Sequence, residues 1–200
     1  MPSLSTSEPL SVWSSEQLSH FRAVLSQSQP LAFGFSSELV VSLGRASRET
    51  DPNSTQIITD ALALASAGHL YGRRCDTLSG GEQARVHLAR VLAQLWDTQQ
   101  GLILLDEPLA ALDPKLQIDI LHCLQQFAKQ RQHTLIAILH DINHALQYFD
   151  RLWLVQKGQL LADIPTNGDA IPLLEQVYDI KLQRYHHESG AWLLATVPSP

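Results

Sequence analysis

Apolar and polar residues recur along the first half of the chain in a pattern that predicts short helices around one strand. Ser14 and Gln17 have the spacing of a capping box for a helix that ends near Phe21. The stretch 22–27 that follows predicts a short strand with a polar end. From about residue 36 to residue 95, capping residues and helical periodicity predict a mainly helical segment.

Three helices account for most of that segment. Ser36 is expected to cap a short helix that ends near Leu43. Asn53 is expected to open a second helix over 55–66. Leucine, valine and tryptophan then recur at helical spacing over 88–96, which predicts the buried stripe of an amphipathic helix.

After residue 100 the pattern becomes an alternation of apolar runs and helices. The runs 102–105 and 135–139 are wholly apolar, as is typical of strands buried on both faces of a sheet. Between them, Asp113 and Pro114 begin a helix as N-cap and first-turn proline. Strand–helix alternation over 101–155 predicts a parallel sheet with crossover helices.

The last quarter of the chain predicts smaller elements. Asp141 caps a helix that ends near Phe149. Runs 152–155 and 159–162 flank a turn at Lys157 and predict a hairpin. A final helix is expected near 171–178, and an edge strand near 192–194.

The composition of the chain excludes several classes of protein. The 200 residues carry a net charge of −6 and no long basic run, which argues against a general nucleic-acid binder. No apolar run is long enough to span a membrane, and the start of the chain lacks the pattern of a secretory signal. Two cysteines, Cys75 and Cys123, make neither a disulfide framework nor a zinc pattern. A soluble cytosolic protein of one domain, or one plus a small lobe, is the expectation.

The first motif that suggests chemistry is the run Leu-Ser-Gly-Gly-Glu-Gln over 78–83. Ser79 and Glu82 can be explained as a capping box, with Gly80 and Gly81 forming the turn before it. The same residues can serve as a phosphate site, because a helix N-terminus exposes N–H groups and glycines let a ligand approach closely. The motif alone leaves both explanations open.

The second motif places two carboxylates, Asp106 and Glu107, directly after an apolar strand. Open α/β sheets bind ligands at this end of their strands. Asp106 could hold Mg²⁺ through water, and Glu107 could polarise an attacking water. A solvated strand end is the plain alternative, and it is less common for a pair of acids than for one.

Two further positions are weaker by themselves. The run 111–114 contains Asp113, which a simple helix cap explains whatever the function. His140 ends the second apolar strand, level with the two carboxylates if the strands are neighbours, where it could touch a γ-phosphate. A lone histidine is more often structural.

In this order, over about 78–141, the four motifs resemble those of the ABC-transporter ATPase family. LSGGEQ resembles its signature, ILLDEP its Walker B, ALD its D-loop and ILHD its switch histidine, while Gln27 resembles its Q-loop glutamine. The resemblance implies an α/β P-loop NTPase core with an inserted helical subdomain, using ATP and Mg²⁺. It makes Glu107 and His140 catalytic, and gives Asp106 and Gln27 to Mg²⁺ through water. Nucleotide binding falls to Gln27, Ser79, Gly80, Gly81, Glu82 and Asp113.

Several stretches resemble the hemin-import ATPases within that family, among them 13–18, 22–27, 43–45 and 88–96. Ser26 and Leu109 depart from the usual residues without removing a catalytic group. The resemblance implies the ATP-binding subunit of an importer of heme or a related metal chelate. Its partners would be membrane permease subunits, a second ATPase subunit in a head-to-tail dimer and, indirectly, a periplasmic or extracellular binding protein, with no nucleic acid. Such a subunit lies peripherally on the cytoplasmic face of the inner membrane.

One motif of that family does not occur in the 200 residues. The Walker A loop G-x-x-x-x-G-K-[S/T] is absent, and none of the four lysines follows a glycine. We therefore expect a core without its first strand and P-loop, truncated at the N-terminus. Four regions are expected: 1–30, an N-terminal β remnant ending in the Q-loop; 31–97, the helical subdomain; 98–165, the RecA-like core; and 166–200, a C-terminal helix and edge strands.

Two other functions compete with transport ATPase activity. The chain could be a non-catalytic remnant that docks on a permease or on an intact ATPase subunit, which the missing Walker A favours. It could also be the carboxy-terminal lobe of a chromosome-maintenance ATPase. In such a lobe, coiled-coil heptads are expected before the signature. Residues 28–77 instead predict short capped helices, which argues against this alternative.

Overall fold

The computed structural model describes residues 10–27, 34–166, 170–186 and 192–197 of the chain. The chain divides into two compact units, Met1–Ile138 and Leu139–Pro200. Each unit is described by itself below.

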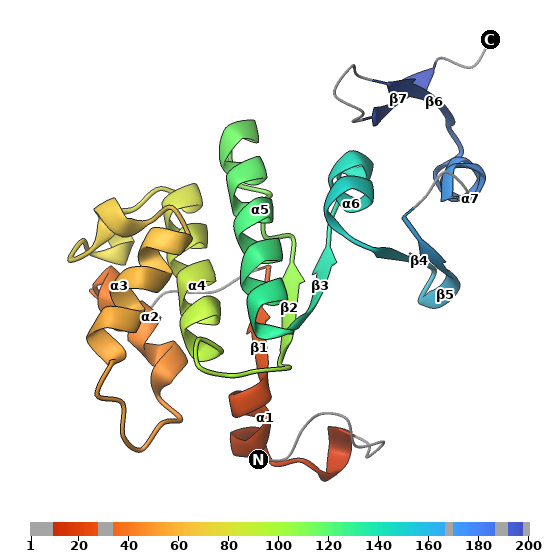
Figure 1. Cartoon of the computed structure of the whole chain (residues 1–200). Helices are drawn as coiled ribbons and strands as arrows, with labels where there is room; N and C mark the ends of the chain where they lie inside the picture. Colours follow the sequence, from red (N-terminus) through yellow and green to blue (C-terminus); the bar gives the residue numbers. More distant parts are fainter. Residues whose placement is uncertain (1–9, 28–33, 167–169, 187–191, 198–200) are drawn as a thin grey trace. The chain divides into compact units, whose positions relative to one another are not determined.

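A three-stranded parallel sheet lies in the first unit. Its strands are β1 (Arg22–Leu25), β2 (Leu102–Asp106) and β3 (Thr134–Ile138), with β2 in the centre. β1 follows a short capped helix, α1 (Ser15–Phe21), as predicted. Helix α5 (Pro114–Arg131) connects β2 to β3 and packs against β3 (Figure 1). The parallel pairing predicted from strand–helix alternation is confirmed for β2 and β3.

The two faces of this sheet are covered to different degrees. On one face Ala23, Ile103 and Leu105 are buried. On the other face Val24 is 38 % exposed and Ile138 is 57 % exposed. The prediction of strands buried on both faces was therefore wrong for the described part of this unit. A wholly apolar run indicates a strand suited to a covered sheet, and it does not say how much of the sheet the chain itself covers.

The helical lobe, residues 36–95, lies beside the sheet in the same unit (Figure 1). Its main helices are α2 (Ser37–Ser42), α3 (Ser54–Leu64) and α4 (Gly80–Gln94). The predicted stripe on α4 is confirmed, because Leu88, Val91 and Leu92 are all buried. The mainly helical character of this segment is likewise as predicted.

Two predicted caps of the lobe differ in detail. Ser36 and Asn53 do stand at the N-caps of α2 and α3, but neither side chain accepts a hydrogen bond from a helix amide. The Ser36 hydroxyl instead donates to Oε1 of Glu38 at 2.6 Å. Asn53 has φ −97° and ψ 7°, outside the extended conformation from which a cap side chain reaches the helix.

Gly44 and Arg45 tie the end of α2 to α4. A Cβ at Gly44 would lie 2.3 Å from the carbonyl oxygen of Arg90, so only glycine permits this approach. Arg45 is 4 % exposed and donates four hydrogen bonds. Its guanidinium donates to Asp51 at 2.7 and 2.8 Å, to Asp97 at 2.6 Å and to the carbonyl of Ala93 at 2.9 Å.

The second unit contains α6 (Ile142–Tyr148), α7 (Ala170–Tyr178) and two antiparallel hairpins. The hairpins are β4 (Arg151–Gln156) with β5 (Gln159–Pro165), and β6 (Lys181–His186) with β7 (Trp192–Val197). Leu146, Leu152 and Leu174 belong to its core. The first hairpin and α7 are as predicted, whereas β6 is new.

The parallel sheet expected over 101–155 is smaller than predicted. Among the described residues β4 pairs with β5 and joins neither β2 nor β3. Lys157 and Gly158 both have positive φ and reverse the chain at once, which accounts for the pairing of β4 with β5. The third strand comes instead from β1, far earlier in the sequence.

Within the described ranges, we find no helix with both the length and the apolar character needed to cross a lipid bilayer.

Candidate functional site

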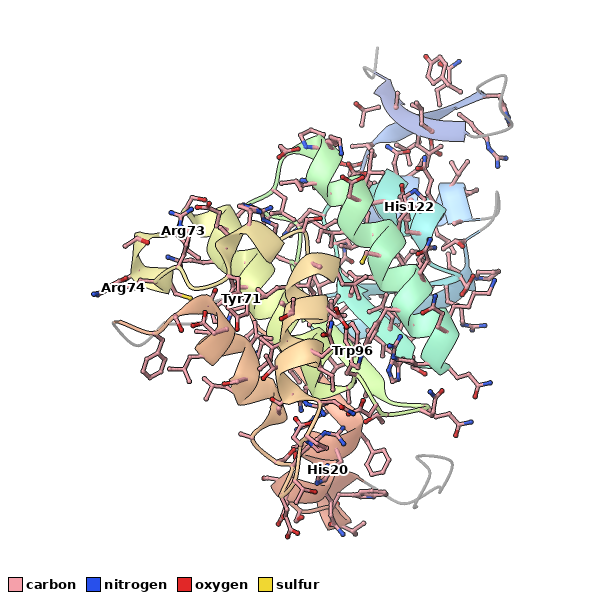
Figure 2. The ribbon with its side chains drawn as sticks, turned by 60° about the vertical axis from the view of Figure 1, so that its left-hand side comes forward. His20, Tyr71, Arg73, Arg74, Trp96 and His122 are labelled. Carbon is pink, nitrogen blue, oxygen red and sulfur yellow. The ribbon has the colours of Figure 1, made fainter. Side chains whose placement is uncertain are left out.

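The signature turn, residues 78–83, lies at the start of α4. Ser79 is the N-cap, and its hydroxyl accepts the Glu82 amide while the Glu82 carboxylate accepts the Ser79 amide at 2.8 Å. The predicted capping box is therefore present. The Ser79 amide, and then its hydroxyl, hold the pKa of Glu82 below its usual value. Arg73, on the outer side of the lobe in Figure 2, lies 3.4 Å from the same carboxylate.

The two glycines of this turn have different surroundings. A Cβ at Gly80 would meet nothing within 4 Å. A Cβ at Gly81 would lie 2.6 Å from the carbonyl oxygen of Ala111 and 3.6 Å from Cδ2 of Leu112. Open space beside Gly80 is compatible with a ligand, whereas Gly81 is pressed against the chain's own backbone.

The carboxylates stand at the carboxyl end of the sheet, as the sequence predicted. Asp106 is the last residue of β2 and is half-buried. Glu107 follows with φ +49°, a left-handed conformation that is uncommon outside glycine. Its amide donates to the carbonyl of Ile138 at 3.2 Å, which ties it to the end of β3. This backbone aims Glu107 out of the strand direction.

Gln27 reaches the same place from the far end of the sequence. Its Nε2 donates to Oε2 of Glu107 at 3.0 Å, across 80 positions of sequence. Parallel pairing explains the contact, because β1 and β2 run in register and end at the same edge. The structure therefore brings Gln27 and Glu107 together.

Asp113 is the N-cap of α5, and its Oδ1 accepts the amide of Leu116 at 3.1 Å. This is the simple capping role that the sequence allowed. His140 lies two residues beyond β3 and belongs to the second unit, just before the α6 cap Asp141. Its grouping with the carboxylates, like the nucleotide role of Asp113, stays a prediction.

Two glutamines that the sequence analysis did not single out hold the loops before α4 and α5. Gln83 Nε2 donates to the carbonyls of Cys75 and Leu78, both at 3.1 Å. Gln117 Nε2 donates in the same way to the carbonyls of Leu109 and Leu112, at 3.2 and 3.0 Å. Each glutamine stands four residues after its N-cap, so a cap–x3–Gln spacing was the signal available in the sequence.

The residues present fit Mg²⁺ and ATP in part. Magnesium in nucleotide sites takes one or two carboxylates and completes its shell with water and phosphate oxygens, which suits Asp106. No cluster of three or more histidine, cysteine or carboxylate side chains that could hold a metal occurs in the described ranges. The amides of α4 suit a phosphate. A glycine-rich, lysine-bearing loop is not among the 200 residues.

A parallel sheet with carboxylates at its edge, together with a capped LSGG turn, is the combination expected of an ATPase of the ABC type. A family model described as ABC transporter matches residues 6–110. The chain belongs to this family.

Among curated proteins, the chain is similar to hemin import ATP-binding proteins named HmuV. It is 51 % identical to that of Pseudomonas aeruginosa over 142 residues, covering 68 % of this chain and 54 % of the relative. It is 43 % identical to that of Pseudomonas fluorescens over 187 residues, covering 92 % and 73 %. The chain thus spans about half of the first relative and about three quarters of the second.

Solved structures are similar in fold. A metal-chelate type ABC transporter in an inward-facing conformation matches with a TM-score of 0.72 at 22 % identity, covering 90 % of this chain and 72 % of that one. A dimeric bacterial ABC transporter cassette matches with a TM-score of 0.65 at 22 % identity, covering 74 % and 65 %. These likenesses confirm the predicted class of fold.

Proposed function

We propose that the chain is the ATP-binding part of an ABC importer that couples ATP hydrolysis to uptake of heme or a related metal chelate. The observation that carries the activity is the hydrogen bond from Gln27 to Glu107, which gathers two residues of ATPase chemistry at the sheet edge. The cargo is supported by the relatives, whose printed names specify hemin import at 51 % and 43 % identity.

Each residue has a definite task in this proposal. Asp106 and Gln27 hold Mg²⁺ through water, and the bound metal supplies neutralisation of phosphate charge. Glu107 orients the attacking water and accepts its proton. His140 contacts the γ-phosphate. Ser79, Gly80 and Gly81 offer amides and a small surface to a phosphate, while Glu82 and Asp113 stabilise the helix starts that border the nucleotide.

The phosphate cradle itself lies outside these 200 residues in this proposal. A P-loop is a strand–loop–helix unit, so it brings a strand and an apolar helix face with it. Two features of the sheet are compatible with the packing of such a unit against it. Within the described residues the outer edge of β3 pairs with no strand, and Ile138 and Val24 leave the neighbouring face half open.

Partners follow from the same proposal. Two ATPase subunits pair head to tail, so that the signature turn of one faces the nucleotide held by the other. A permease subunit docks on the helical lobe, where Leu39 of α2 (44 % exposed) and Leu43, which directly follows α2 (52 % exposed), lie one turn apart. A binding protein outside the membrane delivers the cargo. The chain then works peripherally on the cytoplasmic face of the inner membrane.

The test is uptake in cells that lack the gene for this chain. Wild-type and Glu107→Gln genes are returned, with Glu49→Gln as a matched carboxylate control on the exposed surface, and uptake of hemin, cobalamin and a ferric siderophore is measured. The proposal predicts that Glu107→Gln abolishes hemin uptake and spares the others, while Glu49→Gln has no effect. Restored hemin uptake with Glu107→Gln would contradict hydrolysis by this chain.

The docking alternative remains a second candidate because the 200 residues contain no Walker A, while Leu39 of α2 and Leu43 directly after it are exposed. This alternative predicts that Glu107→Gln does not change hemin uptake, whereas the double variant Leu39→Asp, Leu43→Asp lowers it. Ile118→Asp, on the similarly exposed Ile118 of α5, is the control for a new surface charge.

A further inference from the structure

Two loops that the proposed function uses come into contact at Gly81. On one side is the signature turn, which the Ser79–Glu82 capping box and Gln83 fix to the helical lobe. On the other is the loop 107–113, which begins at Glu107. The carbonyl oxygen of Ala111 lies 2.6 Å from the place where a Gly81 Cβ would stand. Real Cβ atoms do not approach a carbonyl oxygen so closely, so the contact exists only because residue 81 is glycine.

The loop 107–113 is rigid from Glu107 to the Gly81 contact. The Ala110 amide donates to the Glu107 carbonyl at 3.3 Å, and the Leu112 amide donates to the Leu109 carbonyl at 3.1 Å. Gln117 holds two carbonyls of the same loop, and Leu109 and Leu112 are buried. A displacement at Ala111 therefore reaches Glu107 through two linked turns rather than being absorbed by a slack segment.

Glu107 is sensitive to such a displacement. It has a left-handed backbone, which persists only where its surroundings over-determine it. Oε2 of its side chain accepts the hydrogen bond from Gln27 at 3.0 Å. A change of a few tenths of an ångström in the loop alters this alignment.

We propose that Gly81 is a positioning residue, which joins the signature turn to the loop 107–113 and thereby keeps Glu107 against Gln27. Its neighbour Gly80 has no such role, since its Cβ position is open. The two glycines of the motif thus serve different ends, Gly80 facing open space and Gly81 facing the chain's own backbone. The catalytic consequence of the Gly81–Ala111 contact rests on the proposed function. The contact itself is independent of that function.

The experiment uses the purified 200-residue chain and nuclear magnetic resonance, so it needs no ATP. In the unaltered chain we expect a cross-peak between the α protons of Gly81 and a methyl of Leu112. In Gly81→Ala we expect amide exchange at Ala110 and Leu112 to rise at least tenfold, with a shift of the Gln27 side-chain amide signal. In Gly80→Ala we expect less than a twofold change and no shift.

Gly101→Ala is the control for lost stability. A Cβ there would lie 3.0 Å from the carbonyl oxygen of Phe21 and 3.1 Å from Nδ1 of His133, at the opposite end of β2. It should destabilise the chain without moving the Gln27 signal. A Gln27 signal that responds equally to Gly101→Ala and Gly81→Ala would overturn the proposal. If Gly81→Ala does not fold, the unaltered chain still tests the proposal. A missing cross-peak between Gly81 and Leu112 in that chain is sufficient to overturn it. Failure of hemin uptake to depend on Glu107 would refute the proposed function and leave these results standing.

Discussion

The helical lobe and the sheet of the first unit differ in how far the chain completes them. In the lobe, buried leucines and valines fill the space between α2, α3 and α4, and the buried Arg45 finds acceptors for its guanidinium. In the sheet, one face is buried and the other is half open, and β3 has an outer edge that pairs with no described strand. The lobe thus packs within itself, whereas the described sheet leaves one face and one edge exposed.

This difference matters because the two regions carry different halves of the proposed chemistry. The lobe carries the signature turn, which needs only its own capping box and Gln83 to be ordered. The sheet carries Asp106 and Glu107, which need a phosphate held nearby before they have anything to act on.

The largest effect is expected from Arg45→Met. Removing this buried guanidinium leaves Asp51 without its hydrogen-bonded cation and Asp97 with only the longer ion pair to Arg48, and breaking a buried ion pair costs about 3 to 5 kcal/mol. Urea unfolding at pH 7 measures the free energy. The control is Arg48→Met, whose longer 3.8 Å ion pair to Asp97 is partly exposed, so its loss should stay below about 1 kcal/mol. Equal losses in the two variants would mean that Arg45 is not a structural centre of the lobe.

A matched pair of isoleucines compares the two regions directly. Ile57 of α3 is 5 % exposed, so Ile57→Ala should cost about 3 kcal/mol of unfolding free energy. Ile138 of β3 is 57 % exposed, so Ile138→Ala should cost less than about 1 kcal/mol. A cost for Ile138→Ala as large as that for Ile57→Ala would show that the sheet face is already covered, and the contrast between lobe and sheet would fail.

A smaller, pH-dependent effect is expected from His87, a buried histidine of α4. Burial, and then the nearby Arg90 charge, lower the pKa of His87 to about 4. The folded chain therefore favours the neutral imidazole. Its free energy of unfolding decreases as the pH falls below 6.5, the pKa of this histidine in the unfolded chain. Between pH 7 and pH 5 the loss should reach about 2 kcal/mol. The direction is the reverse of that for a histidine paired with a carboxylate.

The check is thermal or urea unfolding from pH 7 to pH 5 of the unaltered chain and two variants. His87→Phe should flatten this part of the profile, whereas the same change at the exposed His122 of α5 (Figure 2) should leave it in place. His87 also has no hydrogen-bond partner for either ring nitrogen among the described residues, so His87→Phe is not expected to cost a polar contact. A profile that keeps its slope in His87→Phe would refute this assignment.

Local patterns were the part of the fold that the sequence could predict. The capping residues of α1, α4 and α5 have side chains that bond neighbours three residues away, so sequence spacing alone identified them. Caps at Ser36 and Asn53 were misjudged in detail because Glu38 and the backbone conformation compete there. Partners distant in sequence, such as those of β1 and Arg45, have no local signature.

The site divides in the same way. Asp106, Glu107 and the signature turn could be predicted because each follows a pattern within a few residues. The Gln27–Glu107 hydrogen bond could be expected only through resemblance, since 80 positions separate the two residues. The Gly81–Ala111 contact was beyond prediction, because a glycine in a turn has the same sequence signature whether a ligand or the chain's own backbone lies beside it.

We propose that these 200 residues hold the hydrolytic and signature groups but not the phosphate cradle. Calorimetric titration of the purified chain with Mg-ATP, with phosphate release measured alongside, tests it most directly. Micromolar binding requires about 8 kcal/mol, whereas an exposed helix N-terminus contributes about 0.3 to 1 kcal/mol, and Asp106 and Glu107 repel a triphosphate that no cradle holds. The account predicts no binding at micromolar concentrations and no turnover above a Glu107→Gln control. Micromolar affinity, or turnover that Glu107→Gln removes, would contradict it.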